Sequence, residues 1–197
     1  MTPPGFAHLL DQARAAHAGS ADLQAFCDFP TDLRALDLSP THFPCADLLA
    51  QETGLFGEPF AALRDAFVAA GPEAEWRETY RDTDIGADFM DRFGCYCLIG
   101  PGGAYDSAQM RAYVVYMPPN LWYPWHHHPA EELYLVIGGE GEFHRQGHAA
   151  QTLRAGQSAF HASNQPHALR THDHPVMSYV LWRNEFDTAP VWSEPVP

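Results

Sequence analysis

From about residue 94 onward, the sequence alternates short β-rich runs with turn residues, and this pattern limits the possible fold more than any other feature. Strand-favouring residues fill each run, while Gly, Pro and Asn lie between the runs. Short strands at this spacing predict an antiparallel sandwich or small barrel. The expected strands are residues 95–99, 111–117, 132–137, 142–145, 157–161, 167–171 and 177–183, with turns at 100–103, 118–120, 138–139 and 164–166.

Residues 6–93 have a different pattern, in which apolar residues recur at helical spacing. The expected helices are residues 6–18, a segment through Phe26 that Ser20 can cap, and residues 31–36, 45–51, 59–70 and 73–81. Because these helices are amphipathic, each should pack on the chain or on a partner subunit. We predict a mainly β fold in one unit, with a helical N-terminal layer (1–93) on a small antiparallel β-barrel (94–197).

Charge and composition exclude several classes of function. The chain has 25 acidic and 11 basic residues, a net charge of −14, which is the wrong sign for nonspecific nucleic-acid binding. All the basic residues are Arg, so a Schiff-base lysine, a pyridoxal-phosphate enzyme and a P-loop are excluded. Without a signal or spanning segment, we expect a cytoplasmic protein with no membrane partner. The four cysteines form no recognisable framework and are expected to be free thiols.

Histidine is concentrated in the β-rich half, where nine of the 12 lie between residues 126 and 174. In an extended chain, His126 and His128 share one face, and Glu132 and Tyr134 share one face. His167 opens a later strand after a proline turn and could supply a third imidazole. Three imidazoles and a carboxylate predict a site for one divalent ion, and they suit Fe(II), Mn(II), Ni(II), Co(II) or Zn(II) about equally.

The other histidines have more ordinary interpretations. His127 points to the opposite face of the same run and is expected to be structural. Those in polar hairpins or loops are not expected to be ligands, namely His144, His148, His172 and His174. His161 is the competitor to His167 for the distant ligand position. The alternative for the whole run of residues 126–128 is a solvated loop.

A tyrosine and several indoles accompany the expected ligands. Tyr134 should point toward the ion, where a dication would lower its pKa and let it act as a base beside a Lewis acid. Its alternative is an ordinary core aromatic. The rings of Trp122, Tyr123, Trp125 and Trp182 could enclose an onium cation, although any one of them could equally fill the core.

Residues 94–184 resemble the cupins, because His126, His128, Glu132 and Gly139 have the spacing of the first cupin motif. The second motif is looser, with Gly156 before His167 and with Thr171 where the family often has Asn. The resemblance implies a cupin or jelly-roll barrel with His126, His128, Glu132 and His167 as metal ligands. Fold alone names no reaction, since cupins include dioxygenases, isomerases, decarboxylases and binding proteins.

Residues 123–134, together with the helical half and the length, look like the DddQ group of cupin-type dimethylsulfoniopropionate (DMSP) lyases of marine bacteria. That resemblance implies a carbon–sulfur lyase that forms dimethyl sulfide and acrylate by β-elimination. It implies Tyr134 as the base, Tyr123 as a substrate-placing group, and His126 as either a fourth ligand or a substrate contact. An Fe(II) cupin dioxygenase and a noncatalytic small-molecule-binding cupin stay open as alternatives. The oligomeric state is also open.

Overall fold

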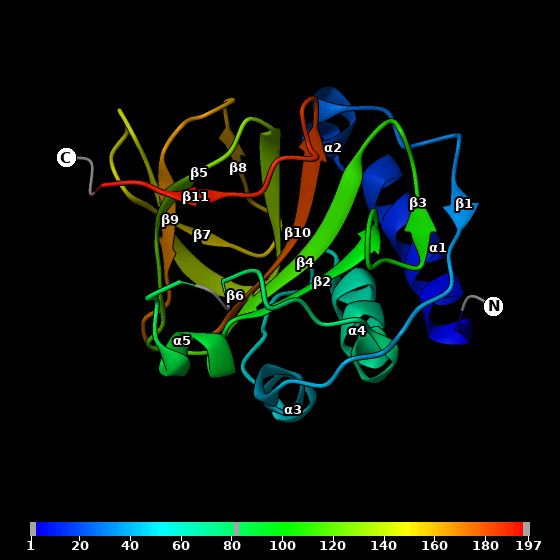
Figure 1. The fold of residues 1–197 in the computed structure, drawn as a ribbon, viewed down its shortest axis with the longest axis horizontal. Helices are drawn as coiled ribbons and strands as arrows, with labels where there is room; N and C mark the ends of the chain where they lie inside the picture. Colours follow the sequence, from blue (N-terminus) through cyan, green and yellow to red (C-terminus); the bar gives the residue numbers. More distant parts are fainter. Residues whose placement is uncertain (1–2, 81–82, 195–197) are drawn as a thin grey trace.

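The structure is a computed structural model that describes residues 3–80 and 83–194 (Figure 1). The helices are α1 (Pro4–Gly19), α2 (Ala21–Phe26), α3 (Pro44–Gln51), α4 (Ala61–Ala70), the 3-10 turn η1 (Gly71–Glu73) and α5 (Ala87–Arg92). The strands are β1 (Arg34–Ala35), β2 (Gly94–Ile99), β3 (Tyr105–Asp106), β4 (Arg111–Met117), β5 (Trp122–His127), β6 (Glu131–Arg145), β7 (Gln151–Arg154), β8 (Ser158–His161), β9 (His167–Arg170), β10 (Val176–Arg183) and β11 (Val191–Trp192).

The helical half agrees with the sequence at most positions. Helix α1 buries a stripe that includes Phe6, Leu9 and Ala13, as amphipathic spacing requires. The predicted cap is confirmed, because the backbone N–H of Leu23 donates to Ser20 Oγ over 3.3 Å at the start of α2. In Figure 1, α1, α3 and α4 gather beside β2 and β4, away from the strands that close the barrel.

Two expected helices are wrong. Residues 31–36 contain the short strand β1, which pairs with β3. In the expected helix at 73–81, η1 ends at Glu73, and Trp76 instead forms a β-bridge with Tyr96. The Trp76 indole is buried, and its Nε1–H donates to the Gly71 carbonyl over 2.8 Å, so tertiary burial overrides local propensity. Residue 81 lies outside the described residues, and α5 had no counterpart among the sequence expectations.

Strands β2, β4, β10 and β6 form a sheet that is buried on both faces. Successive side chains alternate between two cores. In β6, for example, Leu133 and Leu135 join the core under the helices, while Tyr134 and Val136 join the core inside the barrel. This sheet therefore separates the helical layer from the interior that holds the candidate site.

The turn expected at residues 138–139 is wrong, since β6 runs unbroken from Glu131 to Arg145. Its first half pairs with β10 and β8, and its second half pairs with β9 and β7. Gly139 has φ +70°, and the pairing register shifts between Met177 and Ser178 on the facing strand. The glycine thus lets one strand turn the corner between the two sheets of the barrel.

Strand β5 carries the histidine run and lies between β9 and β11. His126 is opposite His167 in the pairing with β9 and opposite Trp192 in the pairing with β11. The register of β5 against β9 shifts between Tyr123 and His126, so alternation is interrupted at that point.

No helix among the described residues has the length and apolarity needed to cross a membrane. Cys27, Cys45, Cys95 and Cys97 are free, as expected.

Candidate metal centre and its pocket

The Glu132 carboxylate lies at the centre of a buried cluster inside the barrel. Its Oε2 is 3.1 Å from His167 Nε2 and 3.5 Å from His128 Nε2. One ligand atom from each of these three residues lies within 4.8 Å of the other two, and all three residues are buried. They come from three places in the fold: His128 directly follows β5, Glu132 lies at the start of β6, and His167 opens β9.

The hydrogen bonds of the imidazoles show how this cluster fits a metal ion. His128 Nδ1 lies 3.0 Å from the Ala130 carbonyl, and His167 Nδ1 lies 2.8 Å from the Gln165 carbonyl. Because a carbonyl can only accept, both Nδ1 atoms donate, and in the neutral form of each ring, which is the form that binds a metal, Nε2 presents a lone pair. These Nε2 atoms are buried and have no hydrogen-bond partner in the structure. Lone pairs facing a carboxylate favour a cation between them, and backbone-fixed Nδ1–H groups are typical of metal-binding histidines.

His161 also belongs to this cluster, which the sequence presented only as the competitor to His167. The β6–β8 register sets His161 opposite Glu132, and its Nδ1 donates to Glu132 Oε2 over 2.8 Å. Its ring stacks on that of His167 at 4.0 Å. Burial lowers the pKa of His161 to about 3, so the ring is neutral. The structure thus brings both candidates together: His167 belongs to the cluster with His128 and Glu132, and His161 is hydrogen-bonded to the Glu132 carboxylate.

His126 lies beside the group of three. Its Nδ1 is 2.8 Å from the Pro124 carbonyl, and its ring meets the His167 ring at 4.1 Å. Burial, together with the neighbouring His167, lowers its pKa well below the usual value. His126 therefore presents a neutral Nε2 toward the same interior without being one of the three clustered ligand atoms.

Trp182 fixes the other oxygen of the central carboxylate. Its indole Nε1–H donates to Glu132 Oε1 over 2.6 Å, and its ring lies 4.2 Å from that of His128. Burial alone would raise the pKa of Glu132, but positive charge on the imidazoles of His128 and His167, together with the hydrogen bond from His161, holds it well below the ordinary value. The carboxylate is thus ionised and held from both sides.

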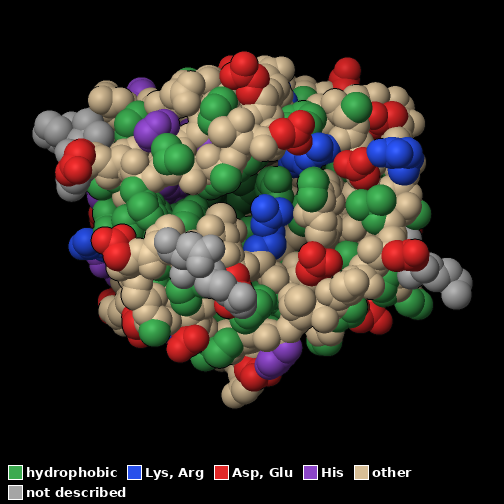
Figure 2. All heavy atoms as spheres, in the orientation of Figure 1, with side chains coloured by type: hydrophobic (Ala, Val, Ile, Leu, Met, Phe, Trp, Pro, Cys, Tyr) green, Lys and Arg blue, Asp and Glu red, His purple; other side chains and the backbone are tan. Residues whose placement is uncertain are grey.

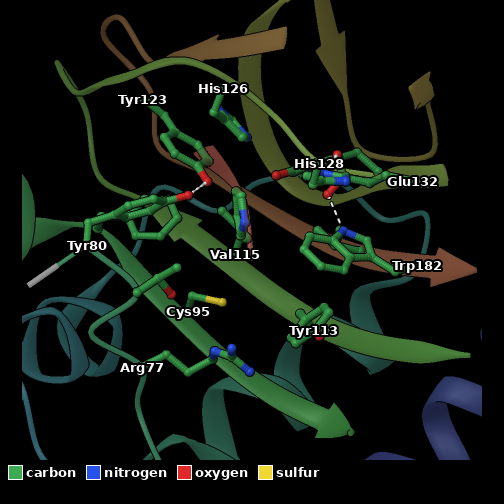
Figure 3. Close-up of a pocket in the computed structure, with 15 residues that line it drawn as sticks. Arg77, Tyr80, Cys95, Tyr113, Val115, Tyr123, His126, His128, Glu132 and Trp182 are labelled. Atoms are coloured by element: carbon green, nitrogen blue, oxygen red, sulfur yellow. Dashed lines mark hydrogen bonds and ion pairs between the residues drawn. The ribbon is translucent and has the colours of Figure 1, made fainter. Parts of the chain in front are cut away.

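A pocket opens onto this cluster (Figure 3). The molecular surface is hollowed near the centre of the face in Figure 2, where hydrophobic side chains form the floor and arginine atoms lie at the rim. The pocket is lined by Arg77, Thr79, Tyr80, Phe93, Cys95, Tyr113, Val115, Tyr123, His126, His128, Glu132, Tyr134, Val180, Trp182 and Pro190.

Trp122 and Trp125, which were expected to help to enclose an onium cation, lie away from this pocket. Neither lines the pocket: both rings pack edge-on against His144, and the Arg170 guanidinium lies 4.6 Å from the Trp122 ring. The register shift before His126 leaves Tyr123 and His126 buried while Trp125 is only half-buried. Of the four rings expected to enclose an onium group, Tyr123 and Trp182 are at the pocket.

Tyr134 and Tyr123 both line the pocket and are both buried. Burial raises the pKa of Tyr134 well above the usual value, and the charge of Glu132 adds to this effect. Burial raises the pKa of Tyr123 in the same direction. The two phenols are therefore protonated in the chain without a metal.

The remaining expected residues have structural contacts. His127 faces outward, and its Nδ1 lies 2.7 Å from Ser193 Oγ. On the outer side of the barrel, His144 Nε2 lies 2.6 Å from Glu142 Oε1, and His172 Nε2 lies 3.2 Å from Glu142 Oε2. Thr171, which departs from the cupin pattern, donates its hydroxyl to the Pro118 carbonyl over 2.6 Å and closes the turn before β5.

Several pocket residues outside the histidine run were missed by sequence reasoning, among them Arg77, Tyr80, Cys95 and Tyr113. Tyr113 lies on β4 and its side chain points into the barrel, which the alternation of residues along this strand could have indicated. Arg77 and Tyr80 belong to the segment expected to be helical, so no local signal placed them at the pocket. The Arg77 guanidinium lies 5.3 Å from the Tyr113 ring.

Fold and site together define a cupin barrel with a helical N-terminal layer and a candidate metal centre in its interior. The family model for dimethylsulfoniopropionate lyase matches residues 21–178. DMSP lyase DddQ of Ruegeria pomeroyi is 48% identical over 98% of this chain and 96% of its own length. The chain belongs to the dimethylsulfoniopropionate lyase family, whose members are carbon–sulfur lyases, and this confirms the resemblance seen in the sequence.

Solved structures agree with this assignment. The crystal structure of DMSP lyase DddQ from Ruegeria pomeroyi superposes with a TM-score of 0.96 and covers 98% of both chains, at 48% identity. A chain from the crystal structures of the DMSP lyases RdDddP and RnDddQII gives a TM-score of 0.92 at 38% identity, covering 96% of this chain and 98% of that one. These matches confirm the predicted mainly β cupin fold with N-terminal helices.

Proposed function

We propose that this chain cleaves dimethylsulfoniopropionate to dimethyl sulfide and acrylate by β-elimination. The observation that carries the proposal is the position of Tyr134, whose phenol shares the inward face of β6 with Glu132 and lines the same pocket, in a chain of this family. One base beside one Lewis acid suits removal of a proton next to a carboxylate.

One divalent metal would be held by His128, Glu132 and His167, with His126 as a fourth ligand or as a contact to the substrate. The donor set admits zinc, iron or manganese, and also nickel or cobalt. When bound, the ion supplies a Lewis acid for the substrate carboxylate and a positive charge that lowers the pKa of a nearby phenol. Trp182 and His161 hold the Glu132 carboxylate in place for this task.

The chain's own residues then account for the elimination. In its phenolate form, Tyr134 takes the Cα proton, the electrons of the broken C–H bond form the Cα–Cβ double bond, and the Cβ–S bond breaks with its electron pair on sulfur. Dimethyl sulfide leaves as a neutral molecule, so no general acid is needed at that end. The rings of Tyr113 and Trp182 would face the sulfonium, where each contact contributes about 0.5–2 kcal/mol.

The direct test is detection of dimethyl sulfide in the headspace above purified protein supplied with DMSP. We expect release under anaerobic conditions, loss of release after treatment with a chelator, and recovery after addition of a divalent metal. Consumption of oxygen without sulfide release would instead support the dioxygenase alternative. Binding of DMSP with neither outcome would support a noncatalytic cupin.

Tyr134→Phe tests the base. The variant should keep its metal content and fold but lose at least about a hundredfold in kcat, which is the usual contribution of a general base. Tyr179→Phe is the matched control, because the Tyr179 hydroxyl is buried in the other core and has no hydrogen-bond partner in the structure. Unchanged turnover in Tyr134→Phe would remove this residue from the proposed role.

A further inference from the structure

Two tyrosines in the wall of the pocket, Tyr80 and Tyr123, have their hydroxyl groups in contact. Figure 3 shows the hydroxyls of Tyr80 and Tyr123 pointing toward each other, and a hydrogen bond joins them. Tyr80 comes from the irregular segment between η1 and α5, whereas Tyr123 lies on β5, 43 residues later. Both line the pocket and are buried.

The Tyr80 ring is fixed by its neighbours. Trp192 of β11 stacks on it at 4.4 Å, and the rings of Phe89 and Phe93 meet it edge-on at 6.0 and 6.3 Å. In the described part of the chain, the Tyr123 hydroxyl is the one hydrogen-bond partner that the Tyr80 hydroxyl has. The surrounding rings therefore offer the Tyr80 hydroxyl no competing strong acceptor.

The Tyr123 ring is fixed as well, and it lies against the candidate metal centre. It stacks on the His126 ring at 4.0 Å, and the His126 ring meets that of His167 at 4.1 Å. Phe93 packs against Tyr123 at 4.7 Å. Since rotation about the C–O bond is the freedom left to the Tyr123 hydroxyl, its hydrogen bond with Tyr80 decides where that hydroxyl points.

The proton count shows what this pair offers. Two phenols carry two hydroxyl protons, and the hydrogen bond between their oxygens uses one of them. The second proton is free for an acceptor in the pocket. An anionic oxygen is the acceptor that gains most from such a donor, because hydrogen bonds to charged groups are the stronger ones.

We propose that Tyr80 is a positioning residue, which holds the Tyr123 hydroxyl so that Tyr123 donates a hydrogen bond to a carboxylate oxygen of the substrate. The inference rests on the proposed function and extends it. During loss of the Cα proton, negative charge grows on that carboxylate. A donor fixed in place is therefore worth more in the transition state than in the bound substrate, and its loss lowers kcat more than it raises KM.

The test is a double-mutant cycle with Tyr80→Phe, Tyr123→Phe and the combination, in protein loaded with metal. Phenylalanine keeps the ring contacts, so the melting temperature and metal content should be preserved. We expect Tyr80→Phe to lower kcat about ten- to a hundredfold with a smaller change in KM. In the Tyr123→Phe background, the same change should cost less than about twofold, because Tyr80 acts through Tyr123.

The control is Tyr96→Phe, which removes a buried phenol hydroxyl that donates to the Phe67 carbonyl in the other core. It should leave kcat unchanged. Equal losses from Tyr80→Phe in the wild-type and Tyr123→Phe backgrounds would overturn the proposal. So would a Tyr80→Phe variant with full kcat.

A binding measurement separates this proposal from the proposed function. Calorimetric titration of metal-loaded protein with propionate, a carboxylate without the leaving group, needs no turnover. Tyr80→Phe and Tyr123→Phe should each weaken propionate by a similar factor of about three to ten, and the double variant by no more. If the variants weaken propionate binding in this non-additive pattern but the wild-type protein releases no dimethyl sulfide, the lyase assignment alone is refuted. Additive weakening, or no weakening by Tyr80→Phe, would refute the positioning role.

Discussion

The role of each buried imidazole depends on the groups that its two ring nitrogens face. At the candidate metal centre, backbone carbonyls take the Nδ1–H of His126, His128 and His167, which leaves their Nε2 atoms for the interior. His17 has the opposite arrangement in the helical layer. Its Nε2 donates to the Cys27 carbonyl over 2.9 Å, and its Nδ1 is buried and has no hydrogen-bond partner among the described residues.

This arrangement predicts that His17 makes the fold sensitive to acid. Burial lowers the pKa of His17 below its usual value of about 6.5, so between these two values the unfolded chain binds a proton that the folded chain does not. Stability therefore falls as the pH drops below about 6.5, by at most about 1.4 kcal/mol per pH unit for this one group.

Urea unfolding of the metal-free protein between about pH 5 and 8 measures this effect. His17→Gln keeps a donor for the Cys27 carbonyl and does not titrate, so its stability should depend less steeply on pH below 6.5. The surface histidine substitution His148→Gln serves as the comparison and should leave the slope unchanged. Parallel curves for His17→Gln and the wild type would contradict the prediction.

Single-residue orientation was predictable wherever strand alternation is regular. The inward faces of His126, His128, Glu132 and Tyr134 follow from local geometry alone. The burial of Tyr123 together with His126 did not follow, because a register shift in β5 lies between them and cannot be read from residue types. The position of His161 depends on the pairing of β8 with β6, which is a long-range property.

At the scale of elements, the expected strands match β2, β4, β6, β8, β9 and β10, whereas β5, β7 and the connection within β6 were not predicted. Residues 138–139 have turn composition, yet Gly139 bends one continuous strand between two sheets. The segment expected to be a helix at residues 73–81 has helical composition, yet in its described part Trp76 is buried against Tyr96 and forms a β-bridge with it. In both places, contacts with distant residues outweigh local preference.

Gly139→Ala should destabilise the fold by about 3 kcal/mol or more. A Cβ at this position would lie 1.9 Å from the Pro175 carbonyl oxygen, and the φ of +70° is itself unfavourable for alanine. Gly147→Ala separates the two effects, because φ is +82° there and nothing lies within 4 Å of an added Cβ. That control should cost only about 1–2 kcal/mol. Equal losses of unfolding free energy would show that the contact with Pro175 relaxes without cost.

For the whole molecule, a metal at this site would connect three separate parts of the barrel. His128, Glu132 and His167 belong to different stretches of chain that come together only in the folded state. A ligand that binds the folded state alone stabilises it by about 2.7 kcal/mol at a concentration a hundred times its Kd. For a chain of this length, this raises the melting temperature by roughly 5–10 °C.

Thermal unfolding with and without added zinc or manganese should show this increase in the wild-type protein. His167→Ala should abolish the increase and reduce the metal content measured by elemental analysis. His144→Ala should retain both, because His144 lies outside the central cluster. A full thermal shift in His167→Ala would remove His167 from the ligand set.

The barrel supplies the clustered ligands, whereas irregular segments outside its long strands supply part of the pocket lining. Arg77, Thr79 and Tyr80 precede the barrel, and Pro190 follows its last long strand. The clustered ligands and part of the pocket lining are thus encoded in separate stretches of sequence. Apart from Tyr80, which is proposed to act in the reaction, substitutions in the outer segments can change which molecules enter the pocket while the ligand cluster is kept.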